Sequence, residues 1–182
     1  MRTYILCLGL ALGIGLAAPQ LCAQQGDSQD TTAQTAKKAK KKAAEKPKQG
    51  KANKIIGHLR TINGVKPNAN ARYYMVLQSA SWCGPCNAEM PTVVKQYKTM
   101  GKRVELILVS HDNSADAAIN FMKKYGADFP CILANSGESG KLPAFKMARG
   151  IPNASMVKAN GKEIINTHAG AVIADWKKYS RK

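Results

Sequence analysis

Two cysteines separated by Gly84-Pro85 stand between an expected strand and an expected helix, and they constrain this chain more than any other feature. The apolar run 73–77 precedes them, and the sequence that follows is typical of a helix. The N-terminus of a helix carries unpaired N–H groups and a partial positive charge, which favour thiolate over thiol. We therefore expect a redox site in which Cys83 is the nucleophile and Cys86, one helical turn further on, is the resolving thiol.

Structural zinc and a static disulfide are the two other uses of such a cysteine pair. Zinc would need a second pair of ligands at matching spacing, and the remaining candidates are scattered along the chain. These candidates are Cys131, His58, His111 and His168. Gly-Pro between cysteines at a helix start favours a working pair over a structural disulfide. We expect no metal and no organic cofactor, and a structural role for the histidines.

Residues 1–23 have the parts of a secretory signal: a basic start, an apolar run over 5–18 and polar sequence after Ala23. The apolar run is shorter than a comfortable bilayer span and contains three glycines, which favours a cleaved signal over an uncleaved anchor. Lipoprotein signals have small residues before the acylated cysteine, whereas Pro19-Gln20 stand close before Cys22. We therefore predict a periplasmic or otherwise exported protein without a lipid anchor.

Cleavage after Ala23 would leave one cysteine beside the Cys-x-x-Cys pair. Exported proteins with structural disulfides have larger even sets of cysteines, so one pair with one cysteine left over favours a working redox pair. The extra residue, Cys131, lies in the apolar run 129–133. We expect a buried, inert thiol at this position.

Residues 24–54 are rich in alanine, glutamine, threonine and lysine and cannot bury enough apolar surface to fold alone. They include nine lysines against three acidic residues, a net charge of +6, and residues 55–182 have a net charge of +10. We interpret residues 24–54 as a solvated spacer, with docking onto an anionic membrane or wall surface as the alternative. The segment has no aromatic residue to stack on bases, so nucleic acid is not an expected partner.

From Ile55 onward the pattern is that of one globular domain. A short β-hairpin is expected first, with Asn63-Gly64 at its turn. A β-α-β unit and further alternating elements follow, which predicts an α/β domain with a central mixed sheet flanked by helices. The expected strands are 72–79, 103–110, 129–134, 153–158 and 162–168, and the expected helices are 84–99, 114–125, a short one ending near 147, and 171–180.

This order of elements resembles the thioredoxin fold, and within it the exported TlpA-like thiol-disulfide oxidoreductases, over residues 55–182. The run 82–86 with Glu89-Met90-Pro91 is similar to that family's active-site signature, and Gly150-Ile151-Pro152 is similar to its second landmark. The hairpin before the first core strand is also similar to TlpA-like domains. The resemblance implies a thioredoxin fold with an N-terminal β-hairpin extension and a redox-active disulfide between the two cysteines.

The resemblance also assigns roles to residues around the cysteines. It implies a cis peptide bond before Pro152, and backbone hydrogen bonds from Ile151 to an extended substrate segment. Trp82 is expected either to pack beside the thiols and shape the substrate-binding surface or to be a tryptophan of the core. Glu89 is either a proton relay for the resolving thiol or a helix carboxylate paired with lysine. Thioredoxins have a buried acidic residue at the position of Leu77, so their usual proton relay is not expected here.

The expected reaction is thiol–disulfide exchange. Gly-Pro between the cysteines, and isoleucine before Pro152, resemble the thioredoxin pattern and imply a reductase for disulfides in exported proteins, including the haem-attachment cysteines of apocytochrome c. A reductase in an oxidising compartment needs electrons from a membrane-bound donor. The alternatives are an oxidase or isomerase with the same site, and a non-catalytic thioredoxin-fold binding module.

Overall fold

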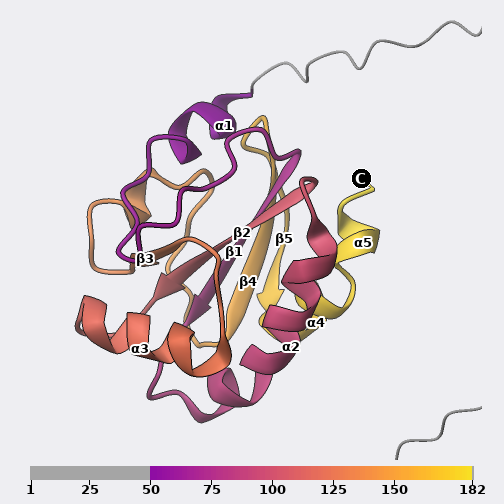
Figure 1. Cartoon of the computed structure of the whole chain (residues 1–182). Coiled ribbons are helices and arrows are strands. Elements are labelled where there is room, and N and C mark those ends of the chain that lie inside the picture. The colour runs from indigo at the N-terminus through magenta and orange to yellow at the C-terminus, as the bar shows by residue number, and fades with distance from the viewer. Residues whose placement is uncertain (1–49, 182) are drawn as a thin grey trace, which may run out of the picture. The chain divides into compact units, whose positions relative to one another are not determined.

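The computed structural model describes residues 50–181. The predicted signal 1–23, with Cys22 in it, and residues 24–49 of the lysine-rich segment lie outside the described residues. Within the described part, the strands are β1 (Tyr73–Ser79), β2 (Val104–Ser110), β3 (Cys131–Leu133), β4 (Asn153–Lys158) and β5 (Glu163–His168). They form one sheet in the order β3-β2-β1-β4-β5 (Figure 1). The sheet is mixed, as predicted, because β1 pairs in parallel with β2 and antiparallel with β4.

The helices of the same part are α1 (Lys51–Ile56), α2 (Gly84–Met100), α3 (Ala115–Tyr125), α4 (Ala169–Ala174) and α5 (Trp176–Tyr179), with a 3-10 turn at Ser139–Lys141. Ser114 caps the N-terminus of α3, since its side chain accepts a hydrogen bond from the Ala117 N–H. The helix expected over 171–180 is divided at Asp175 into α4 and α5. No helix within residues 50–181 is both long and apolar enough to span a bilayer.

The sheet separates two hydrophobic cores. Successive side chains of a strand point to opposite faces, so Leu106 and Leu108 of β2 lie in one core, and Ile107 and Val109 lie in the other. Helices α2, α3 and α4 cover the first face, and Figure 1 shows α2 and α4 along it. Helix α1 covers the second face. Strand β2 is buried at all seven positions, which explains its nearly continuous apolar sequence.

The predicted β-hairpin is wrong, because Ile56 belongs to helix α1 and no strand precedes β1 in the described part of the chain. The chain does turn at Asn63-Gly64. However, the Ile62 N–H donates to the Cys131 carbonyl of edge strand β3 at 2.8 Å. The Asn63 side chain accepts from the Cys131 N–H and donates to the Phe129 carbonyl. Backbone groups on a sheet edge need partners, and this segment provides them for β3 instead of pairing with itself.

The folded region begins before the predicted boundary at residue 55. Helix α1 places Ala52 and Ile56, four residues apart, on the sheet, while Lys51 and Lys54 stay exposed. The Ala52 N–H also donates to the Ala159 carbonyl at 2.9 Å. The lysine-rich segment therefore contributes its last residues to the core.

Candidate active site

The ends of four strands meet at one edge of the sheet. The register places Ser79 opposite Ser110 between β1 and β2, and Asn153 of β4 opposite both Gln78 and His168. The residues that follow β1 and β2 therefore lie near those that precede β4 and those that end β5. The predicted cysteine pair follows β1, and the predicted Ile151-Pro152 segment precedes β4, so the topology brings these distant parts of the sequence together.

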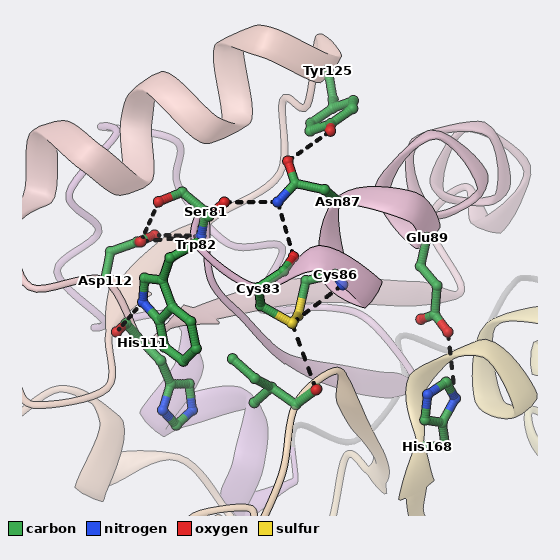
Figure 2. The surroundings of a disulfide bond; sticks show 11 residues. Ser81, Trp82, Cys83, Cys86, Asn87, Glu89, His111, Asp112, Tyr125 and His168 are labelled. Carbon is green, nitrogen blue, oxygen red and sulfur yellow. Dashed lines mark hydrogen bonds and ion pairs between the residues drawn. A yellow bond between two sulfur atoms is a disulfide. The ribbon is translucent and has the colours of Figure 1, made fainter.

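The two cysteines lie where the sequence predicts, at the turn from β1 into α2. Cys83 is the N-cap of α2, and its Sγ accepts a hydrogen bond from the Cys86 N–H at 3.3 Å. The two residues form a disulfide with their Cα atoms 5.2 Å apart (Figure 2). Cys83 is 7% exposed and Cys86 is 1% exposed. An incoming thiol or disulfide therefore reaches the sulfur of Cys83 first.

The segment before β4 faces the sulfur pair. The Ile151–Pro152 peptide bond is cis, as the resemblance implied. The Ile151 carbonyl oxygen lies 3.6 Å from Cys83 Sγ, and its side chain packs against the small cluster of Ala80, Cys83 and Cys86. The backbone of Ile151 is thus next to the reacting sulfur, and its hydrogen bonding to a substrate stays a prediction.

Trp82 lies on the surface beside the cysteines. Its side chain is 66% exposed, and the indole N–H donates to the His111 carbonyl at 3.4 Å (Figure 2). The ring of a core tryptophan would be shielded from solvent, whereas most of this ring is accessible. Trp82 is therefore not part of the core. The position is compatible with the predicted substrate-binding role.

Sequence reasoning missed Asp112, which fixes the turn before the cysteines. Its buried carboxylate accepts hydrogen bonds from the Ser81 N–H at 3.1 Å and from the Ser81 hydroxyl at 2.6 Å. It also accepts from the Ser110 hydroxyl at 2.7 Å. The available signal was an acidic residue two positions after a mostly apolar strand, at the sheet edge that carries the cysteines. Asp112 thus ties the end of β2 to the residue that precedes Trp82.

Replacing Asp112 with alanine is expected to lower the free energy of unfolding by about 2–4 kcal/mol, since three buried or half-buried donors lose their acceptor. Urea unfolding of the oxidised protein measures this loss. The control is Asp116→Ala, which removes an exposed carboxylate from the first turn of α3 and should cost less than about 1 kcal/mol. Equal losses in the two variants would contradict the assignment.

Asn87, also missed, joins the same turn to α3. Its Nδ2 donates to the carbonyls of Ser81 and Cys83 at 2.7 and 2.9 Å. Its Oδ1 accepts from the Tyr125 hydroxyl at 2.8 Å (Figure 2). The same oxygen accepts from Lys124 Nζ at 3.1 Å. One amide side chain therefore holds the backbone on both sides of Trp82 and anchors it to a neighbouring helix. No sequence signal distinguishes this asparagine from other helix residues.

Glu89 pairs with His168 instead of with a lysine. Its Oε1 lies 3.4 Å from His168 Nδ1, and Figure 2 shows the carboxylate turned toward that ring and away from the sulfurs. A β-carbon at Gly170 would lie 2.9 Å from Oε1, so the missing side chain there makes room for the carboxylate. The other oxygen, Oε2, is buried and has no hydrogen-bond partner among the described residues. A proton-relay role for Glu89 stays a prediction.

Cys131 is a buried, free thiol, as predicted. Burial, with a smaller contribution from the charge of Asp112, raises the pKa of Cys131 to about 12, so the thiol stays protonated at neutral pH. Leu77 is buried in the hydrophobic core that also contains residues of α2. Residues 50–181 bring together no group of three or more histidine, cysteine or acidic side chains suited to a metal ion.

The chain is similar to known proteins over most of the described residues. The sequence profile of the Redoxin family matches residues 59–180. The thiol-disulfide oxidoreductase ResA of Bacillus subtilis (strain 168) is 33% identical over 85 residues, which are 46% of this chain and 46% of that protein. The chain thus spans about half the length of the curated relatives it matches.

Solved structures show the same fold. Thioredoxin from Wuchereria bancrofti has a TM-score of 0.52 at 23% identity, covering 66% of this chain and 93% of that one. A thiol:disulfide interchange protein from Bacteroides sp. has a TM-score of 0.51 at 17% identity, covering 62% of this chain and 75% of that one. The predicted thioredoxin fold is confirmed, apart from the hairpin.

Proposed function

Because this chain belongs to the Redoxin family, we propose that it is an exported thiol-disulfide oxidoreductase that reduces disulfides in other exported proteins. The observation that carries the proposal is the position of Cys83 Sγ at the N-terminus of α2, bonded to Cys86 one turn further on. This arrangement supplies a sulfur on the more exposed of the two cysteines, a dipole that favours its thiolate, and a second thiol within reach of it.

The reaction starts from the reduced cysteine pair. The Cys83 thiolate attacks one sulfur of the substrate disulfide, and the other substrate sulfur leaves as a thiolate that takes up a proton. Cys86 then loses its proton and attacks the Cys83 sulfur in the mixed disulfide. The bond between Cys83 and Cys86 forms, the second substrate thiol is released, and two electrons have passed to the substrate. The N–H of Cys86, which donates to Cys83 Sγ, supports the thiolate of the first step.

The surroundings of the sulfurs supply the proposed substrate contacts. The backbone of Ile151, 3.6 Å from Cys83 Sγ at its carbonyl, would bond an extended substrate segment, and Trp82 would cover it from the other side. Glu89 would assist deprotonation of Cys86 only through a rearrangement that frees its carboxylate from His168. Pro152 is the third proposed substrate-binding residue, next to Ile151 in the same segment.

A reductase ends each turnover with an oxidised cysteine pair. In an oxidising compartment the pair must be reduced again, and we propose a membrane-bound electron donor for that step. Disulfides in exported proteins, with the haem-attachment cysteines of apocytochrome c as one class, are the proposed substrates. For the part of the lysine-rich segment that precedes α1, we retain the solvated spacer, with docking onto an anionic surface as the alternative.

The reduction potential of the pair tests the direction of electron flow. Equilibration with glutathione or dithiothreitol, followed by alkylation, is expected to give a value near that of thioredoxin, about −270 mV. A value near about −120 mV, typical of strong oxidants, would replace the reductase with an oxidase. The variant Cys131→Ala should have the same potential as the wild type, because the Cys131 thiol is buried. A pair that exchanges with neither reagent would leave only a binding module.

A further inference from the structure

Within residues 50–181, two large apolar side chains are exposed, and both belong to the segments around the sulfurs. Among the described residues, the exposed large hydrophobic side chains are Trp82, at 66%, and Met147, at 56%. Trp82 precedes Cys83 directly, and Met147 lies four residues before Ile151. Exposed aromatic and methionine side chains beside a reactive group are typical of a surface that contacts another polypeptide.

A buried glutamine holds Met147 in place from both sides. Gln78, near the end of β1, donates from Nε2 to the Lys146 carbonyl at 2.8 Å, and its Oε1 accepts from the Ala148 N–H at 3.0 Å. The same oxygen lies 3.0 Å from His111 Nε2. A buried side-chain amide that satisfies the backbone of a loop fixes the course of that loop. Gln78 thus fixes the backbone of both residues that flank the exposed Met147.

His111 extends this hydrogen-bonded chain to Trp82. Its carbonyl accepts from the indole N–H of Trp82, and its ring contacts Gln78. Burial lowers the pKa of His111, which outweighs the opposite effect of Asp112 and favours the neutral ring at neutral pH. The neutral ring donates from Nε2 to Gln78. A chain of hydrogen bonds through His111 and Gln78 thus connects the indole of Trp82 with the backbone on either side of Met147.

The charges next to Met147 are positive. Lys146 and Arg149 are exposed, and neither has an acidic partner within residues 50–181. Asp112 and Glu89 lie at the sheet edge that carries the cysteines, and both acidic side chains have partners. Asp112 is buried and accepts hydrogen bonds from Ser81 and Ser110, and Glu89 pairs with His168. The exposed Asp116 lies in the first turn of α3. An uncompensated lysine and arginine on either side of an exposed methionine favour a partner with negative charge.

We propose that Trp82, Lys146, Met147 and Arg149, here called the docking rim, select disulfide-bearing polypeptide segments in which acidic side chains accompany an apolar one. The apolar side chain packs on Trp82 and Met147, and the acidic groups pair with Lys146 and Arg149. This inference rests on the proposed exchange reaction and specifies the substrate class of that site. Bond making and breaking are those of the exchange: two electrons pass from the Cys83–Cys86 dithiol to the bound disulfide.

Single-turnover reduction of two synthetic peptides tests this preference. The peptides share one disulfide and a leucine beside it, and differ only in three positions that are glutamate in one and lysine in the other. Fully reduced wild-type protein is expected to reduce the acidic peptide about 10-fold faster or more at low salt. The difference should shrink in about 1 M salt, where the screening length falls to about 3 Å. Equal rates at low salt would overturn the proposal.

Charge reversal distinguishes the effect of the docking rim on peptide preference from the effect of the overall positive charge of the domain. The double variant Lys146→Glu with Arg149→Glu is expected to prefer the lysine peptide. The matched control is Lys95→Glu with Lys102→Glu, which makes the same change in net charge at exposed positions of α2 and the turn before β2. The control should retain the wild-type preference. If the two double variants behave alike, net charge explains the preference and the docking rim does not.

Two further measurements isolate the apolar contact and the chemistry. Met147→Ser is expected to slow both peptides about 5-fold while the acidic preference persists, since an exposed apolar contact contributes about 1 kcal/mol. Bis(2-hydroxyethyl) disulfide, small and uncharged, should be reduced at the same rate by the wild type and all variants. Failure of the wild type with this compound would refute the exchange reaction itself. Normal reduction of it, without any difference between the peptides, would refute the docking rim alone.

Discussion

Replacing Cys86 with alanine is expected to stop turnover and to trap a mixed disulfide between Cys83 and its substrate. Removal of a residue that acts in a covalent mechanism lowers turnover by roughly a thousandfold or more. The first attack still occurs in this variant, because the more exposed Cys83 keeps its place at the N-terminus of α2. The resolving step does not occur. Non-reducing gel electrophoresis of the variant with a disulfide substrate, followed by mass spectrometry, measures the trapped species.

Two companion variants assign the order of the thiols. Cys83→Ala is expected to lose turnover without accumulating a mixed disulfide, since the sulfur of Cys86 is almost fully buried. Cys131→Ala should turn over like the wild type. A mixed disulfide that forms through Cys86 would reverse the assignment of nucleophile and resolving thiol. Absence of any mixed disulfide in Cys86→Ala would contradict the exchange mechanism.

The second large effect is on stability, and it is expected from a buried carboxylate at the end of the sheet opposite the cysteines. Glu105 lies in β2 among apolar residues and stands opposite Tyr74 of β1. Burial raises the pKa of Glu105 from 4.5 to about 7, although a hydrogen bond from the Asn68 backbone opposes this shift. The pKa values of Tyr74, which stands opposite Glu105, and of Tyr97 are raised to about 12, mainly by burial and then by the charge of Glu105.

This pKa makes stability depend on pH. Between pH 4.5 and 7 the folded protein holds a proton on Glu105 that the unfolded chain releases. The stabilisation is complete below pH 4.5, decreases as pH rises, and is lost above about pH 7. A difference of about 2.5 pKa units corresponds to about 3 kcal/mol in the free energy of unfolding. Urea unfolding at pH 5 and pH 8, at constant ionic strength, measures this decrease.

Glu105→Gln is expected to remove most of that decrease and to be more stable than the wild type at pH 8. The glutamine is neutral at both pH values and can still accept from the Asn68 N–H. The control is Glu163→Gln in β5, a strand with no fully buried position. It also removes a negative charge, but a basic domain should gain no stability from that loss. If both variants gain equally at pH 8, burial of Glu105 is not the cause.

Local sequence patterns were sufficient for the elements that form the site. The predicted strand 153–158 agrees with β4 at both ends, and the helix after the cysteines was predicted to within one residue of α2. Long apolar runs and caps such as Ser114 act within a few residues, so they can be read from the chain. The Asn63-Gly64 turn was also real, but its flanking strands were not, because the open edge of β3 offered better partners.

The sequence by itself determined the reactive pair, its place at a strand-to-helix turn and the burial of Cys131, because these follow from neighbours along the chain. Only the tertiary structure decided the partners of that pair. Asp112, Asn87 and Gln78 act through hydrogen bonds to residues that come close only when β1, β2, β4 and α3 pack together. A short polar side chain has no local signature of such a contact, since its energy depends on the burial and geometry that packing creates.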